Sequence, residues 1–192
     1  SDWSSDVCSS DLVYGSFTTN LNIDSCTYID ADLYFYSNPK VLLDEMGNKS
    51  VSISEHRFTR KLNNIKNGKY CVQFMTFKNN QEGLKVIKWW RDACIEWCYS
   101  YHEDGKFGDQ KYLDDWLERF PNIVHNIVNH GCGVAPWNDL RYNFYKKENQ
   151  LKIIDKEEKK EYPVVFYHFH SIKNDFKNDT LRLINYKPKK QT

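Results

Sequence analysis

The order of strand-like and helix-like segments predicts an α/β fold with a mixed central sheet flanked by helices. Four apolar runs have the length and composition of buried strands, at residues 27–36, 72–77, 123–128 and 164–170. Between the second and third runs, apolar residues from Leu84 to Tyr101 recur at helical spacing. No internal repeat or interdomain linker is visible, so one domain is expected over residues 13–175.

The first strand carries Asp30 and Asp32 inside an aromatic and β-branched run. In one continuous strand, residues i and i+2 share a face, so both carboxylates are expected on the same side. Two carboxylates packed in an apolar setting repel each other and lose solvation unless a cation lies between them. A hard divalent ion meets that need. The alternative is that one Asp ends the strand and caps a turn.

Composition describes a folded protein of balanced charge. The chain has 192 residues, a length sufficient for a buried hydrophobic core. Of these residues, 16% are aromatic and 28% charged, which is typical of a globular protein. A formal net charge of +1 excludes a strongly basic nucleic-acid binder, so no nucleic-acid partner is expected. Residues 141–192 hold 13 Lys and Arg against 7 Asp and Glu. Such a segment can help to hold a diphosphate, although a solvated surface is the commoner explanation.

The two ends of the chain lie outside the expected domain. Residues 1–12 resemble translated sequencing adapter and are expected to be a non-native tail, and the polar residues 13–25 predict a loop or a frayed end. Residues 176–192 are expected to form a basic tail or a helix. Five cysteines remain without the first tail, and no Cys-x-x-Cys pair is present. Reduced thiols and a cytoplasmic location are therefore expected. No apolar run reaches the length of a transmembrane helix.

Shorter elements connect the main strands. Residues 41–46 predict a helix closed by Gly47, and residues 51–53 predict a strand that runs into His56 and Arg57. Charged residues at the carboxyl end of a strand are well placed to bind a ligand in an open α/β sheet. A surface loop explains the same pair about as well.

Two helix starts carry polar signals. Asn79 lies three residues before Glu82, an arrangement typical of a capping box, and Asp109 opens a second helix that Pro121 stops. Most of the tryptophans of these two helices are expected in the core. The two predicted helices contain Trp89, Trp90, Trp97 and Trp116.

Two later segments predict loops. Residues 130–138 are rich in glycine, which lets a backbone approach a ligand, but their spacing matches neither a P-loop nor a dinucleotide fingerprint. Residues 146–161 are charged and predict an exposed hairpin or loop.

The last strand, residues 164–170, carries His168 and His170 on one face by strand parity. Imidazole ligands beside the carboxylates suit Mn²⁺ better than Mg²⁺. Such a site keeps coordination positions open for phosphate oxygens. A satisfied core histidine is the competing interpretation.

Together, the Asp-x-Asp strand, the Gly108-Asp109-Gln110 segment and the late His-aromatic-His strand resemble metal-dependent glycosyltransferases of the GT-A, Rossmann-like fold. The resemblance implies that Asp32 binds Mn²⁺ or Mg²⁺ and the donor diphosphate, and that Asp30 contacts the ion or the ribose. It implies a metal ligand among His168 and His170.

The same resemblance implies further substrate contacts. Gln73 lies on the strand that lines the donor-sugar pocket in this family, Asp109 and Gln110 contact the transferred sugar, and Lys173 contacts the diphosphate. His56 and Arg57 are expected to face the acceptor or the diphosphate.

This family places a nucleotide-binding region before the Asp-x-Asp strand. The chain is therefore expected to be an N-terminally truncated enzyme, inactive by itself. The implied reaction moves a sugar from a nucleotide-diphospho-sugar to a glycan or small-molecule hydroxyl acceptor. Two alternatives stay open: a metal-dependent nucleotidyltransferase or phosphotransferase, and a non-catalytic carbohydrate-binding domain.

Overall fold

The computed structural model describes residues 9–20, 22–175 and 180–183. The chain forms two compact units. Unit 1 comprises residues 1–30, 40–56 and 64–129, and unit 2 comprises residues 31–39, 57–63 and 130–192. Each unit is therefore assembled from segments that are distant in the sequence.

The sheet of unit 1 has four strands in the order β1-β4-β3-β5. These strands are β1 (Ser25–Ile29), β3 (Val51–Glu55), β4 (Tyr70–Lys78) and β5 (Val124–Asn126). β4 pairs antiparallel with β1 and with β3, and β5 pairs parallel with β3. The sheet is mixed, which confirms the α/β class predicted from the sequence.

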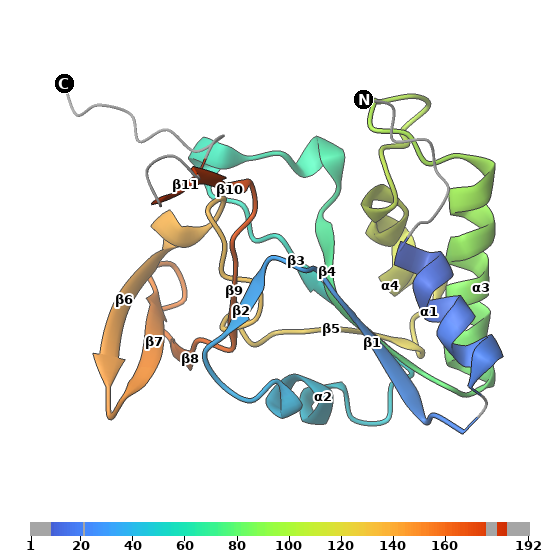
Figure 1. Ribbon diagram of the computed structural model, residues 1–192, viewed down its shortest axis with the longest axis horizontal. Helices are drawn as coiled ribbons and strands as arrows, with labels where there is room; N and C mark the ends of the chain where they lie inside the picture. The colour runs from blue at the N-terminus through green and yellow to red at the C-terminus, as the bar shows by residue number, and fades with distance from the viewer. Residues whose placement is uncertain (1–8, 21, 176–179, 184–192) are drawn as a thin grey trace. The chain divides into compact units, whose positions relative to one another are not determined.

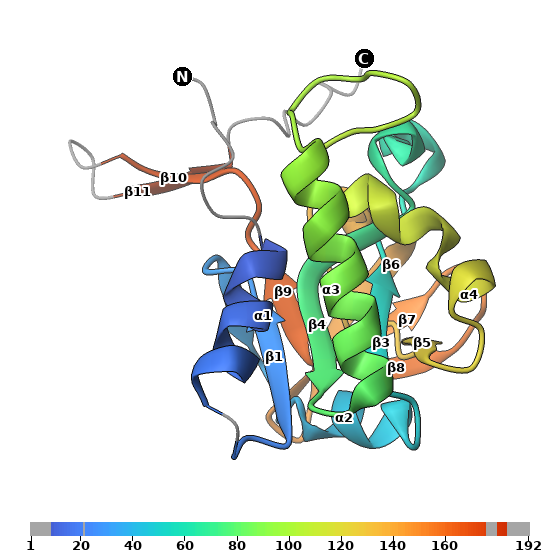
Figure 2. The same cartoon turned by 90° about the vertical axis from the view of Figure 1, so that its right-hand side faces the viewer.

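Two helices, α1 (Ser9–Thr19) and α3 (Gln81–Glu96), lie side by side over one face of this sheet (Figures 1 and 2). The core formed where these helices pack on the sheet includes the fully buried side chains of Ile53, Phe77 and, from α3 itself, Trp90. Shorter helical segments complete the unit. They are α2 (Lys40–Met46), α4 (Trp116–Arg119) and the 3-10 turns η2 (Ile65–Asn67) and η3 (Gln110–Asp115).

The sequence predicts a loop or a frayed end over residues 13–25, and this prediction is wrong for residues 13–19, which belong to α1. Val13 and Phe17 are four residues apart on one face of the helix, and both are buried in the core. Three of its hydroxyl groups, those of Ser16, Thr18 and Thr19, bond to carbonyls one turn back, as Ser16 Oγ does to the Leu12 oxygen at 2.8 Å. A polar composition is therefore compatible with a helix here. α1 also includes residues 9–12 of the adapter-like tail.

α3 confirms the long amphipathic helix but shifts both of its ends. Asn80, not Asn79, is the N-cap, and its side chain accepts a hydrogen bond from the Gly83 N–H at 2.9 Å. The Asn79 side chain donates to the Ile23 carbonyl instead. The helix ends at Glu96, so Tyr101 lies beyond it.

Gly83 lies in the first turn of α3, against the backbone of Lys78. A Cβ on Gly83 overlaps the Lys78 carbonyl oxygen and comes within 3.2 Å of its carbon. Gly83→Ala is therefore expected to destabilise the protein by about 2 kcal/mol, because the clash with backbone outweighs a helix-propensity gain of roughly 1 kcal/mol.

Gly15→Ala is the matched control, because nothing lies within 4 Å of a Cβ built there in α1. That variant is expected to gain up to roughly 1 kcal/mol. Urea denaturation of both variants measures the difference. Equal effects on the free energy of unfolding would contradict the clash at Gly83.

In the described part of the chain, unit 2 contains three small antiparallel sheets. β2 (Leu33–Phe35) pairs with β9 (Phe166–His168). The hairpin β6 (Tyr142–Lys147) and β7 (Gln150–Asp155) is extended by β8 (Glu161–Pro163). This sheet, drawn in orange in Figure 1, confirms the predicted charged hairpin.

The third sheet of unit 2 pairs β10 (Ile172–Asp175) with β11 (Thr180–Leu183). Strand structure at residues 180–183 corrects the prediction of a tail or helix for this part of residues 176–192. The remainder of that stretch lies outside the described residues.

The continuous strand predicted over residues 27–36 is also wrong. β1 ends at Ile29, β2 begins at Leu33, and a turn at residues 31–32 separates them. The Asp30 N–H bonds to the Gln73 carbonyl of β4 at 3.0 Å, whereas Asp32 leads into β2. Asp30 belongs to unit 1 and Asp32 to unit 2, so the two carboxylates do not share one strand face.

Candidate metal centre

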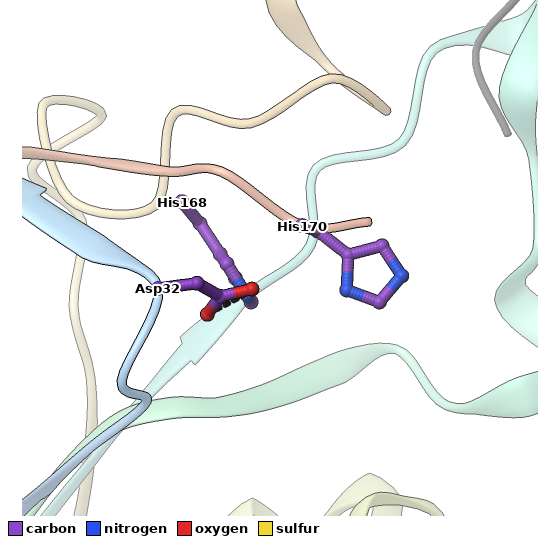
Figure 3. Close-up of side chains that lie close together, drawn as sticks. All are labelled: Asp32, His168 and His170. Carbon is purple, nitrogen blue, oxygen red and sulfur yellow. Dashed lines mark ion pairs between the residues drawn. The ribbon is translucent and has the colours of Figure 1, made fainter. Parts of the chain in front are cut away.

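Asp32, His168 and His170 come together in unit 2. Antiparallel pairing of β2 and β9 sets Leu33 opposite His168, and the Phe169 N–H donates to the Asp32 carbonyl at 2.9 Å. Asp32 Oδ1 lies 2.9 Å from His168 Nε2. One ligand atom from each of the three side chains lies within 4.8 Å of the others. Figure 3 shows the Asp32 carboxylate against the His168 ring, with the His170 ring beside them.

His168 is buried, while His170 is exposed. Burial lowers the pKa of His168 to about 4, although the nearby Asp32 carboxylate acts in the opposite direction. The His168 ring is therefore neutral at pH 7. A neutral imidazole is the form that binds a metal ion.

The donor set fits a divalent ion. Two ligands at about 2.1 Å in neighbouring positions around one ion lie roughly 3 Å apart. The Asp32 oxygen and His168 nitrogen are 2.9 Å apart. A carboxylate with two imidazoles suits Mn²⁺ or another transition ion better than Mg²⁺. Asp30 does not belong to this group.

Asp30 and Asp109 instead share a polar network in unit 1. The Tyr28 hydroxyl donates to Asp30 Oδ1 at 2.9 Å, and Ser9 Oγ donates to Asp109 Oδ2 at 2.9 Å. Burial raises the pKa of Tyr28 to about 12; a hydrogen bond with Ser9 opposes this rise, and the negative charge of Asp30 adds to it. The network thus joins two carboxylates to which the sequence resemblance assigns different contacts, Asp30 to the ion or the ribose and Asp109 to the transferred sugar.

Asp109 occupies the cap position of η3, but its side chain makes no capping hydrogen bond. Burial raises the pKa of the Asp109 carboxyl, and the Ser9 hydroxyl opposes that rise. Gln110 donates from Nε2 to the Asn67 carbonyl at 3.0 Å. The side-chain cap predicted for Asp109 is wrong, and contact of Asp109 and Gln110 with a sugar stays a prediction.

The other predicted substrate residues are spread over both units. His56 and Gln73 are buried in unit 1, with His56 Nδ1 3.2 Å from the Lys69 carbonyl oxygen. In unit 2, Arg57 has a φ of 51° and donates to the Cys132 carbonyl at 2.8 Å. Lys173 lies in β10, and its side chain is outside the described part. Their roles in substrate binding stay predictions.

A second cluster, made of His130, Asp155 and Glu158, escapes sequence reasoning. The ligand atoms of these side chains also lie within 4.8 Å of one another. Arg141 already supplies a cation there, with Nε 2.6 Å from Asp155 Oδ2. Burial and the nearby Arg57 lower the pKa of His130, although Asp155 acts in the opposite direction. The charged composition of residues 146–161 was the available signal, but it did not indicate a buried carboxylate.

Comparisons with known proteins give two curated relatives, and no family model matches the chain. Uncharacterized protein YfnF of Bacillus subtilis (strain 168) is 31% identical over 159 residues, which cover 79% of this chain and 50% of the relative. Uncharacterized protein YfnD of the same strain is 29% identical over 146 residues, covering 74% and 45%. The chain therefore spans about half the length of these relatives.

Among solved structures, mouse xyloside xylosyltransferase 1 in its apo form matches with a TM-score of 0.44 and 14% identity, over 84% of this chain and 62% of that one. Within the described residues, no helix is both long and apolar enough to cross a membrane.

Proposed function

We propose that the chain is part of a divalent-metal-dependent glycosyltransferase that uses a nucleotide-diphospho-sugar donor and a hydroxyl acceptor. The observation that supports this proposal is the convergence of Asp32 with His168 and His170, which lie far apart in the sequence. The sequence pattern pairs the same residues through its resemblance to GT-A enzymes. Asp30 is left out of the proposed ligand set because its carboxylate bonds with Tyr28 in unit 1.

In the proposed site, Asp32, His168 and His170 hold a Mn²⁺ or Mg²⁺ ion. When bound, the ion neutralises charge on the leaving diphosphate, which lowers the barrier to sugar transfer. Asp32 contributes a negative charge that offsets the ion, and burial keeps the His168 ring neutral. Asp109 and Gln110 are assigned to the transferred sugar from the sequence resemblance alone.

The test replaces Asp32 by Asn, which keeps the size of the side chain and removes its charge. Mn²⁺ binding to this chain is measured by isothermal titration calorimetry. Mn²⁺-stimulated hydrolysis of a panel of sugar nucleotides is measured on the full gene product, because the chain spans about half of its relatives. Activity is expected to fall by about 100-fold or more, since a metal supplies several kcal/mol of transition-state stabilisation.

Asp44→Asn is the matched control, because Asp44 is exposed and pairs only on the surface with Lys40. It is expected to leave Mn²⁺ binding and hydrolysis unchanged. Full activity of Asp32→Asn at limiting Mn²⁺ would remove the ion site from the mechanism. Activity that is independent of any added metal, and unaffected by chelation, would do the same.

A further inference from the structure

Trp137 stands beside both histidines of the candidate ion site. The centroid of its ring is 5.1 Å from that of His168 and 5.5 Å from that of His170, at interplanar angles of 84° and 64°. The two imidazole centroids are 5.5 Å apart, and their planes are nearly perpendicular at 88°. Both imidazoles therefore contact one indole.

The side chain of Asn138, the residue after Trp137, makes two hydrogen bonds with the backbone of the glycine-rich loop. Asn138 Nδ2 donates to the Gly133 carbonyl at 2.9 Å, and its Oδ1 accepts from the Ala135 N–H at 2.9 Å. Asn138 is fully buried and Trp137 is 5% exposed. These two bonds connect residues 133–138 of the glycine-rich loop to one another.

The same loop is bonded to β9, the strand that ends at His168. The His168 N–H donates to the Val134 carbonyl at 2.8 Å, and Val134 forms a parallel bridge with Tyr167. The Trp137 carbonyl of the same loop accepts a hydrogen bond from the Thr59 N–H at 3.3 Å. The indole and the His168 imidazole are thus presented by backbones that are bonded to each other, and His170 follows two residues later in the chain.

We propose that Trp137 is a positioning residue, which holds the two imidazoles so that both can bind the same divalent ion. The inference rests on the ion site of the proposed function. An imidazole turns about two side-chain torsions, and its ordering on binding opposes affinity. A rigid indole in edge contact with both rings removes much of this freedom before the ion arrives.

The test compares Mn²⁺ affinity of the whole chain with Trp137→Leu and Trp137→Phe. Leu keeps an apolar side chain and removes the flat ring, whereas Phe keeps a ring. Trp137→Leu is expected to weaken Mn²⁺ binding by about 10-fold to 100-fold, as other losses of outer support for metal ligands do. Trp137→Phe is expected to restore most of the affinity.

Trp97→Leu is the control for removing a buried tryptophan, since Trp97 is 7% exposed and lies in unit 1. It is expected to keep wild-type Mn²⁺ affinity. Thermal melting of each variant tests whether the chain is still folded at the temperature of the Mn²⁺ binding measurement. Equal Mn²⁺ affinity of wild type and a folded Trp137→Leu would overturn the positioning role.

Cu²⁺ used in place of Mn²⁺ gives a second readout, because pulsed EPR detects the imidazole nitrogens bound to copper. Two imidazoles are expected in the wild type and a mixture with fewer in Trp137→Leu. Two imidazoles in both proteins would overturn the inference. The two proposals can fail separately. If Mn²⁺ binding to this chain depends on Trp137 but the full gene product transfers no sugar, the positioning role of Trp137 is supported and only the proposed reaction is ruled out.

Discussion

Trp90→Ala is expected to destabilise the protein by about 4 kcal/mol, the cost typical of emptying a buried tryptophan site. Trp90 is fully buried in the core of unit 1. Its ring lies nearly parallel to Phe77, with centroids 6.4 Å apart, and meets Trp116 edge-on at 5.6 Å. Its Nε1–H donates to the Asp109 carbonyl at 2.9 Å. The substitution therefore removes both core volume and a hydrogen bond that anchors the start of η3.

Trp90→Phe separates these two contributions. Phe retains most of the apolar contact and loses the indole N–H, so a cost of roughly 1–2 kcal/mol is expected. Trp89→Ala is the matched control on the same helix, because Trp89 is only partly buried and its ring lies under the Arg119 guanidinium. Urea unfolding measures all three variants. A loss in Trp89→Ala as large as that in Trp90→Ala would contradict the core position of Trp90.

Asp155→Asn is expected to destabilise the protein by about 3 kcal/mol, because breaking a buried ion pair leaves its partner uncompensated. Asp155 is fully buried, and Oδ2 accepts from Arg141 Nε at 2.6 Å and from His130 Nδ1 at 2.7 Å. Oδ1 accepts the backbone N–H groups of Glu157 and Glu158, at 2.7 and 3.0 Å. One carboxylate thus ties the turn after β7 to a loop and to η4 (Asp139–Arg141).

The effect of Asp155 should depend on pH. Burial acts to raise the pKa of Asp155, but the Glu158 N–H, Arg141, the Glu157 N–H and His130 outweigh it and hold the pKa at about 2, below the ordinary 3.8. A carboxyl whose pKa is depressed on folding stabilises the folded state above its unfolded pKa. That stabilisation, roughly 2 kcal/mol, is lost as the pH falls from about 4 towards 2.

Urea unfolding of wild type and Asp155→Asn between pH 7 and pH 3 measures this dependence. The difference in free energy of unfolding is expected to be constant above pH 5 and to shrink below pH 4. Asp44→Asn, at an exposed pair, should differ from wild type by less than about 0.5 kcal/mol at every pH. A difference for Asp155→Asn that does not change across this range would show that its carboxylate is not held ionised by these partners.

Elements with strong local patterns were predictable from the sequence. The strand predicted over residues 72–77 lies within β4, and the helix predicted over residues 41–46 is α2, followed by Gly47 at a φ of 55°. Trp90 and Trp116 are fully buried, as their helical spacing indicates. Such elements bury one face against a large core, and this requirement imposes a period that the sequence displays.

Elements that depend on a distant partner were not predictable. α1 buries the side chains of Val13 and Phe17, with Tyr14 partly buried beside them, against a core contributed by other segments. The break between β1 and β2 has no local signal apart from the two aspartates themselves. The Asp30 N–H is taken by β4, and Leu33 pairs with His168 of β9. The turn between the two strands agrees with the alternative that an Asp ends the first strand, whereas the partner of each strand is a segment far away in the sequence.

By itself, the sequence predicted which kinds of side chain belong to the candidate site: two carboxylates inside one aromatic strand, and two histidines on one face of a late strand. That late strand, β9, ends at His168, so His170 lies in the turn beyond it and the two do not share a strand face. Only the tertiary structure decided which carboxylate joins them. The β2–β9 pairing brings Asp32 to His168, while the turn leaves Asp30 bonded to Tyr28 in unit 1. Strand parity describes neighbours along one chain segment, whereas the ligands of an ion are selected by pairing between segments that are far apart in the sequence.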